Sequence, residues 1–145
     1  MQVNNKKFVL LSWVKDIQII KDIRLEVFIK EQTIPEELEW DQDEDGAHHF
    51  GIISNEILIA YARVLIKQNI HIGRMAVRKK FRRAGIGSFL LSNIIDHVDG
   101  WNHSKKIILS AQEQAIPLYE KNLFQNRGNK YLDDGIIHYD MELIR

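Results

Sequence analysis

The chain has 145 residues, of which 45% are apolar, so it is long enough to bury one hydrophobic core, and we expect a single domain spanning residues 1–145. Twenty Lys and Arg residues balance twenty Asp and Glu residues, which argues against a general nucleic-acid-binding protein and against a protein that binds membrane surfaces. The sequence contains no cysteine, which excludes disulfides, thiolate metal sites and a cysteine nucleophile and suits a reducing cytoplasm.

The N-terminal third predicts one strand and one amphipathic helix. The apolar run 8–14 predicts a strand, because the small-residue pattern of an export signal does not follow it. Asp16 can cap a helix over residues 17–32, whose apolar positions recur on one side. Pro35 ends this helical region and can open a further short turn. No apolar run approaches the roughly 18 residues of a membrane span, so we expect a soluble, cytoplasmic protein.

The rest of the chain alternates strand and helix patterns. Strands are predicted by alternating or β-branched runs, and helices by apolar residues spaced three and four apart. In chain order the predicted elements are strands over residues 48–54, 57–66 and 70–77, a helix over 86–99, a strand over 106–110, a short helix over 115–122, an edge segment that begins at 131 and a strand over 136–143. This order predicts an α/β (α+β) fold with a mixed central sheet of six to seven strands and helices on both faces.

The most informative stretch joins the strand 70–77 to the helix after Gly85. Five basic residues within 78–83, followed by Gly85 and Gly87, precede the helix. The first turn of a helix leaves backbone N–H groups without partners, and guanidinium groups hold phosphate oxygens, so this junction can bind a polyphosphate. The Walker lysine is missing, and Leu90 stands where a dinucleotide fingerprint needs Gly or Ala. From these residues alone, phosphate binding and a tight turn flanked by solvated charges are equal alternatives.

Several short blocks resemble one family of enzymes. Arg82-x-x-Gly85-x-Gly87, set directly after a strand, is similar to the acyl-CoA pyrophosphate loop of the GNAT acyltransferase superfamily. Further blocks resemble the ElaA-like branch of that superfamily and follow its order from about residue 24 to about residue 141. They are Val27-Phe28-Ile29-Lys30-Glu31-Gln32, Ala60-Tyr61-Ala62-Arg63, Ile72-Gly73-Arg74, Leu109-Ser110-Ala111-Gln112, Tyr119 with Phe124, and Asp134-Gly135-Ile136-Ile137-His138.

The resemblance implies a GNAT-like fold and an acyl-CoA-dependent N-acyltransferase that transfers acetyl from acetyl-CoA, as co-substrate, to a primary amine. The acceptor nitrogen would attack the thioester directly in a ternary complex. The acceptor would be a small-molecule amine or a protein amino group, with a homodimer as an option and with no metal, nucleic acid or membrane involved. The implied cofactor-binding residues are Met75, Ala76, Val77, Arg82, Arg83, Ala84, Gly85, Ile86, Gly87, Ser88, Gln112 and Tyr119.

Tyr119 occupies the position that in the GNAT pattern lies beside the thioester sulfur. A phenol with an ordinary pKa of about 10 can protonate a leaving thiolate whose conjugate acid has a pKa of about 8.5, or can donate a hydrogen bond to it. The alternative interpretation is a core tyrosine with its hydroxyl at the surface.

Transfer to an amine also needs a base, because a lysine-like ammonium has a pKa of about 10.4 and is mostly protonated at neutral pH. The candidates are Glu31, His48 and the carboxylates of residues 36–45. The resemblance favours Glu31 and His48 without choosing between them, and a hydrogen-bonded strand histidine is an equal interpretation of His48. By the same resemblance the acceptor pocket would be lined by Arg63, Arg74 and His138, with surface ion pairing as the alternative.

Residues 36–45 hold seven carboxylates and no cation. The pattern Asp41-x-Asp43-x-Asp45-Gly46 matches only the first half of a calcium loop, with Ile52 where a glutamate is required. We therefore expect no metal site and interpret the segment as a solvated acidic loop that could attract a cationic acceptor. The neighbouring His48 and His49 would point to opposite faces of a strand, which argues against a two-histidine metal site.

Two positions depart from the family pattern. Leu123 stands where Tyr-x-x-x-Gly-Phe has glycine, so we expect Asn122 to supply the left-handed turn. Ile137 replaces the proline of Gly-Ile-Pro-His, which affects the local placement of His138. Two other functions stay open, namely a non-catalytic acyl-CoA-binding sensor or interaction module and a nucleotide-binding regulatory module.

Overall fold

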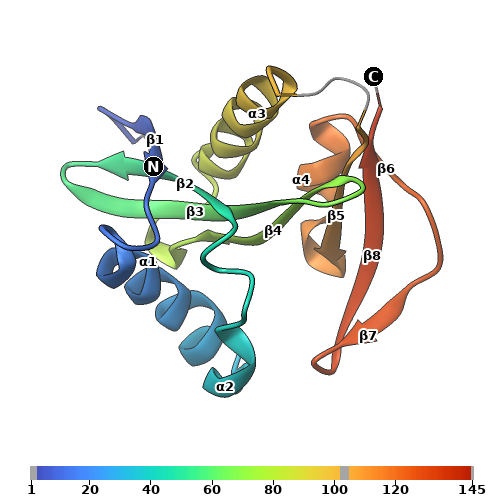
Figure 1. The fold of residues 1–145 in the computed structure, drawn as a ribbon, viewed down its shortest axis with the longest axis horizontal. Helices are drawn as coiled ribbons and strands as arrows, with labels where there is room; N and C mark the ends of the chain where they lie inside the picture. The colour runs from blue at the N-terminus through green and yellow to red at the C-terminus, as the bar shows by residue number, and fades with distance from the viewer. Residues whose placement is uncertain (1–2, 102–104, 145) are drawn as a thin grey trace.

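The computed structural model describes residues 3–101 and 105–144, which form an eight-stranded mixed sheet with helices on both faces (Figure 1). The strand order is β1-β2-β3-β4-β5-β8-β6, and β7 pairs with β8. All pairs are antiparallel except β4 and β5, which run parallel. The strands are β1 (Lys7–Leu11), β2 (His48–Ser54), β3 (Ile57–Ile66), β4 (Ile70–Val77), β5 (Ile107–Gln112), β6 (Phe124–Asn126), β7 (Tyr131–Asp133) and β8 (Ile136–Leu143).

Helices cover the sheet on opposite sides. The helices are α1 (Ile17–Arg24), which continues into a π-helical segment (Leu25–Glu31), α2 (Glu36–Glu39), α3 (Ile86–Asp99) and α4 (Ile116–Lys121), with short 3₁₀ turns at Lys79–Phe81 and Glu113–Ala115. In Figure 1 α3 lies above the sheet, and α1 and α2 lie below it. No helix within the described ranges is long and apolar enough to cross a membrane.

Two apolar clusters hold these layers together. On one face of the sheet α3 buries Leu90, Ile94 and other side chains against β2, β3, β4 and β5. On the other face α1 and the π-helical segment bury Ile20, Ile23 and Val27 against β3 and β4. Each buried side chain of this size contributes about 1.5–3 kcal/mol, so the apolar spacing of three and four residues fixes which face of each helix meets the sheet.

The predicted fold class is confirmed, and two local details differ from expectation in the first half of the chain. The predicted helix over 17–32 is α-helical only as far as Arg24 and then becomes π-helical. Asp16 does not cap α1 through its side chain, because its carboxylate accepts a hydrogen bond from the Ser12 N–H at 2.8 Å instead. The sequence signal for a cap was present, but a second local donor competes for the same oxygen.

Two further differences lie after α4. The sheet has eight strands, not six or seven, because the three-residue β6 is too short to leave a periodic signal. The left-handed turn before β6 is formed by Leu123, at φ 70°, and not by Asn122, at φ −100°, so that prediction was wrong. The Asn122 side chain instead donates hydrogen bonds to Leu118 O at 2.8 Å and to Ser88 Oγ at 3.1 Å, which ties α4 to α3.

Candidate active site

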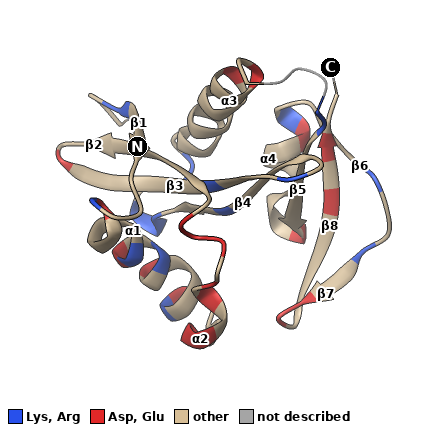
Figure 2. Cartoon of the chain, viewed as in Figure 1, with Lys and Arg blue, Asp and Glu red and all other residues tan. Residues whose placement is uncertain are grey.

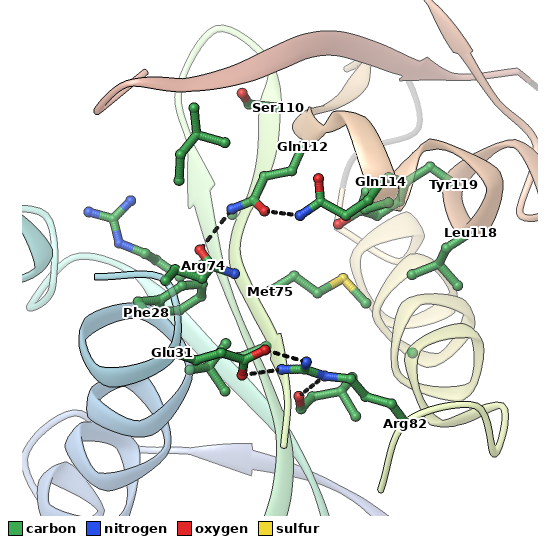
Figure 3. Close-up of a pocket in the computed structure, with 18 of the residues that line it drawn as sticks. Phe28, Glu31, Arg74, Met75, Arg82, Ser110, Gln112, Gln114, Leu118 and Tyr119 are labelled. Atoms are coloured by element: carbon green, nitrogen blue, oxygen red, sulfur yellow. Dashed lines mark hydrogen bonds and ion pairs between the residues drawn. The ribbon is translucent and has the colours of Figure 1, made fainter. Parts of the chain in front are cut away.

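A cavity of about 840 Å³ opens where β4 and β5 separate (Figure 3). The two parallel strands pair only from Ile70 opposite Ile107 to Ile72 opposite Leu109. Beyond these pairs both strands continue, but their facing edges no longer share hydrogen bonds, and the cavity occupies the gap between them. The π-helical segment, α2, the start of α3, α4 and β8 contribute the remaining walls.

A bulge in β4 accompanies this separation. Tyr61 pairs with Ala76 and Arg63 pairs with Gly73, so two residues of β4 face one residue of β3. The first of the two, Arg74, has φ 49°, a conformation that is costly for a residue with a side chain. A bulge bends its strand, so the second half of β4 can turn away from β5 and leave its outer edge facing the cavity.

The basic turn and the first turn of α3 line one end of the cavity. Gly85 has φ 76°, which favours glycine, and α3 begins directly after it. The backbone N–H groups in the first turn of a helix have no partners within it, and in α3 they belong to Ile86, Gly87 and Ser88, all of which line the cavity. At Gly87 a Cβ atom would lie 3.2 Å from Leu118 Cδ2, so glycine lets α4 pack closely against this turn.

Arg82 does not present a free guanidinium to the cavity. Its Nη1 and Nη2 contact the two carboxylate oxygens of Glu31 at 2.5 and 2.7 Å, and its Nε donates to Val77 O at 2.8 Å (Figure 3). The hydrogen bonds from Arg82 lower the pKa of the Glu31 carboxyl. The structure thus joins a predicted base directly to a predicted phosphate ligand.

Tyr119 lies in α4 with 7% of its surface exposed, and it lines the cavity. Its ring packs edge-to-face on Phe124, with 6.1 Å between the centroids. Burial raises the pKa of the Tyr119 phenol to about 12. The hydroxyl has no hydrogen-bond partner among the residues that the structure describes, so it is available to a ligand.

Three glutamine side chains form a hydrogen-bonded chain across the cavity, and Figure 3 labels two of them, Gln112 and Gln114. Gln112, at the end of β5, donates to Gln32 Oε1 at 2.8 Å and accepts from Gln114 Nε2 at 2.6 Å. Of the three, only Gln112 was predicted as a site residue. Gln32 ends one of the blocks that carry the resemblance, so a signal for it was present, whereas Gln114 had none.

His138 lies on β8 opposite Gln112 and lines the same cavity. Its Nδ1 is 2.8 Å from Ile136 O, and a carbonyl oxygen can only accept, so Nδ1 carries a proton. In the neutral ring Nε2 therefore holds a lone pair. The ring stacks on Tyr131, with 6.0 Å between the centroids, and this contact fixes its orientation.

Most of the predicted site residues meet at this cavity. Those that line it are Glu31, Arg74, Met75, Ala76, Val77, Arg82, Arg83, Gly85, Ile86, Gly87, Ser88, Gln112, Tyr119 and His138. Ala84, Arg63 and His48 are not among the lining residues. His48 lies on the α3 side of the sheet, where its ring packs on Trp101 at a centroid distance of 4.4 Å.

The acidic segment 36–45 is only partly the solvated loop that its composition suggested: Glu36, Glu37, Asp41 and Asp45 are exposed, whereas Glu39 and Glu44 are buried. Arg24 is fully buried and pairs with Glu39 and Glu44 at 2.7 and 2.8 Å. Asp41 pairs with Arg63 at 2.8 Å and with Arg74 at 3.3 Å. Figure 2 shows this red segment beside blue positions on β3 and β4. Ion pairs therefore neutralise its centre, and the described residues contain no cluster of three or more His, Asp or Glu side chains suited to a metal.

The fold and this cavity define an acyltransferase of the GNAT class, and comparison with known proteins agrees. The family described as "Acetyltransferase (GNAT) domain" matches residues 14–145. The chain therefore belongs to the GNAT acetyltransferase family.

Individual relatives span nearly the whole chain. The chain is 32% identical to the uncharacterized N-acetyltransferase YjcF of Bacillus subtilis over 132 residues, which cover 88% of this chain and 94% of that protein. The crystal structure of ElaA from Escherichia coli superposes with a TM-score of 0.86 at 24% identity, covering 96% of this chain and 99% of that one. A GNAT acetyltransferase from Elizabethkingia anophelis, solved with acetyl-CoA bound, has a TM-score of 0.71 at 20% identity, covering 96% and 95% of the two chains.

Proposed function

We propose that the protein transfers an acetyl group from acetyl-CoA to a primary amine by direct attack of the amine on the thioester. The observation that carries this proposal is a single cavity that joins the open first turn of α3 to Tyr119 and His138. Membership of the GNAT family supports the reaction class, and the bound acetyl-CoA of the Elizabethkingia relative supports the donor. The absence of cysteine suits a cytoplasmic setting and leaves no thiol to carry the acyl group.

The residues at the end of β4 and at the start of α3 suit the chemical groups of acetyl-CoA. Unpartnered N–H groups of Gly87 and Ser88, together with Arg83, suit a diphosphate. The unpaired edge of β4 at Met75 to Val77 offers backbone groups to an amide-bearing pantetheine arm, as to an added strand. Glycine at position 87 also suits the packing of α4, because a Cβ there would lie 3.2 Å from Leu118 Cδ2 and that side chain would have to shift.

Tyr119 stabilises the leaving sulfur as a hydrogen-bond donor. When the amine nitrogen forms its bond to the carbonyl carbon, the C–S bond breaks and its electron pair stays on sulfur as a thiolate. The pKa of Tyr119, about 12, lies above the value of about 8.5 for a thiol, so full proton transfer would be uphill by about 5 kcal/mol. A hydrogen bond from the Tyr119 hydroxyl to the thiolate requires no proton transfer, and the negative charge on the sulfur strengthens it.

His138 is the base that the geometry favours. Glu31 is held by Arg82, and His48 packs on Trp101 and does not line the cavity. The Nε2 lone pair of neutral His138 is free to take the proton that the amine loses, either directly or through a water molecule. Arg74, whose guanidinium is paired with Glu39 and Asp41, would then form part of the wall that holds the acceptor.

The test combines binding with turnover. Isothermal titration calorimetry with CoA should show binding, and acetyl-CoA with a panel of primary amines and lysine peptides should release free thiol in steady state. Tight CoA binding with no thiol release on any amine would contradict the enzyme and favour an acyl-CoA sensor. Displacement of CoA by ATP or NAD would instead favour a nucleotide-binding module.

A further inference from the structure

The contact between Glu31 and Arg82 occupies the guanidinium atoms that could otherwise bind a phosphate. A guanidinium can hold an oxyanion through two paired edges, one formed by Nη1 and Nη2 and the other by Nε and Nη2. The Glu31 carboxylate occupies the first edge, and Val77 O accepts from Nε on the second (Figure 3). Neither edge is open, so Arg82 cannot hold a phosphate with two hydrogen bonds unless one partner leaves.

The two partners differ in how easily they can leave. Val77 O belongs to the backbone at the end of β4, so moving it would disturb the sheet. Glu31 is the last residue of the π-helical segment, and 34% of its side chain is exposed, as is 36% of the Arg82 side chain. A rotation about the Glu31 side-chain bonds moves its carboxylate away from Arg82 and leaves the backbone in place.

The relative strengths of the contacts favour such an exchange. A partly exposed ion pair shifts an equilibrium by about fivefold at most. A diphosphate carries more charge than a carboxylate, and in this cavity it would also meet the free N–H groups of Gly87 and Ser88. A diphosphate would therefore displace Glu31 from Arg82, and competition with Glu31 would lower the apparent affinity for the diphosphate.

We propose that Glu31 is a positioning residue that holds Arg82 in the cofactor-free protein and is exchanged for the diphosphate when acyl-CoA binds. This inference rests on the proposed function, because it requires a ligand of the acyl-CoA class. Once Arg82 is taken, the released Glu31 carboxylate faces the cavity and attracts the ammonium of the acceptor. Acyl-CoA then binds before the amine, and the amine site is complete only in the loaded protein.

The exchange is tested with Glu31→Gln, which keeps the shape of the side chain and weakens its hold on Arg82. Calorimetry with CoA should show about three- to fivefold tighter binding for this variant than for the wild type, because the competitor is lost. Removing any nearby carboxylate would also favour an anion through long-range charge, so Glu26→Gln is the matched control. Glu26 pairs with Arg78 at 2.8 Å and does not line the cavity, so its loss should leave CoA affinity within twofold.

Repeating the Glu31 substitution in an Arg82→Gln variant tests whether the effect depends on the contact between these two residues. In Arg82→Gln the substitution of Glu31 should no longer tighten CoA binding, since there is no guanidinium left to compete for. Initial-rate kinetics distinguish the exchange from a purely structural role of Glu31. Under the exchange, Glu31→Gln should lower the KM for acetyl-CoA and raise the KM for the amine, whereas a structural role would not shift the two values in opposite directions.

The outcomes separate the two proposals. Unchanged or weaker CoA binding in a folded Glu31→Gln protein, with the wild type still binding CoA, overturns the exchange and means that Glu31 orients Arg82 in the loaded state. If neither protein binds CoA, the proposed function fails, and the exchange fails with it. A crystal structure of the CoA complex that retains both Glu31–Arg82 hydrogen bonds would also overturn the exchange.

Discussion

The Tyr119 hydroxyl contributes to catalysis only if it meets charge that develops on the sulfur. Tyr119→Phe keeps the ring packing on Phe124 and removes one hydrogen bond to an ion. Such a bond contributes about 1.5–3 kcal/mol, so we expect kcat to fall about 10- to 100-fold. CoA affinity measured by calorimetry should change little, because uncharged thiols are weak acceptors. Full turnover by the variant would remove Tyr119 from the mechanism.

Substitution of His138 should lower kcat more than substitution of Tyr119. His138→Ala removes the proposed base but leaves the first turn of α3 intact, so kcat should fall about 10²- to 10⁴-fold with CoA affinity unchanged. Added imidazole can enter the space left by the ring, and we expect it to restore part of the rate.

The matched control is His48→Ala. His48 packs on Trp101 away from the cavity, and its removal should leave the rate within twofold of the wild type. Loss of rate in His48→Ala, or an unaffected rate in His138→Ala, would return the assignment of the base to His48 or to Glu31.

At the scale of elements, one buried arginine joins α1 to the acidic segment. Arg24 contacts the carboxylates of Glu39 and Glu44 and also donates to Glu39 O at 2.8 Å. Arg24→Met would keep an apolar stem but leave two buried carboxylates without this cation. Breaking one partner out of a buried ion pair costs about 3–5 kcal/mol, so urea denaturation should show a loss of that size.

Lys30→Met is the control for the Arg24 variant, because Lys30 is exposed on the adjoining π-helical segment. It should change the free energy of unfolding by about 0.5 kcal/mol or less. If Arg24→Met were as stable as this control, the ion pairs would be balanced by their cost of desolvation, and packing alone would hold the acidic segment.

Local patterns in the sequence predicted elements well, because the apolar spacing that marks a helix or strand is the same spacing that packs it. Ile20, Ile23 and Val27 are buried on the predicted side of their helix. Arg24, next to Ile23 in the chain, is fully buried as well. What the pattern could not supply was the pair of carboxylates that makes burial of Arg24 tolerable, since they lie 15 and 20 residues away in the chain.

At the candidate site, too, the sequence could not predict contacts between residues that lie far apart in the chain. The basic residues and glycines indicated a phosphate loop, and the family resemblance implied Tyr119 and Gln112; the structure places residues of all three on one cavity. Neither signal could predict that Glu31 contacts Arg82, because this contact joins the end of the π-helical segment to the turn before α3, 51 positions further along the chain. The same reason explains the acidic segment, whose composition suggested solvation while its partners on β3 and β4 remained invisible in the linear sequence.

At the scale of the whole molecule, the chain balances its charges through internal pairing. The sequence has no net charge, yet its acidic and basic residues are segregated along the chain. In the folded protein the acidic segment meets Arg24, Arg63 and Arg74, which come from α1, β3 and β4. Because these elements belong to both the helical layer and the sheet, protonation within this cluster should affect the stability of the entire fold.

His49 provides the test of that coupling. It is buried beside the cluster, its Nε2–H donates to Glu44 O at 2.9 Å, and its Nδ1 accepts from the Tyr61 hydroxyl. Burial lowers the pKa of His49 below its ordinary value of 6.5, and the nearby Arg24 and Arg63 act in the same direction while Glu44 opposes them. The stability that depends on neutral His49 is complete above pH 6.5 and is lost as the pH falls below it, because the unfolded chain then binds the extra proton.

Burial raises the pKa of Glu39, which acts in the opposite sense, so the measurement must isolate His49. Thermal and urea unfolding of the wild type and His49→Gln should be compared between pH 7.5 and pH 5, where the contribution of Glu39 is common to both proteins. We expect the wild type to be the more stable at pH 7.5 and its advantage to shrink below pH 6.5, by at most about 1.4 kcal/mol per pH unit. An advantage that stays constant over this range would mean that the folded protein accepts the charged imidazole, and that the cluster does not couple protonation to folding.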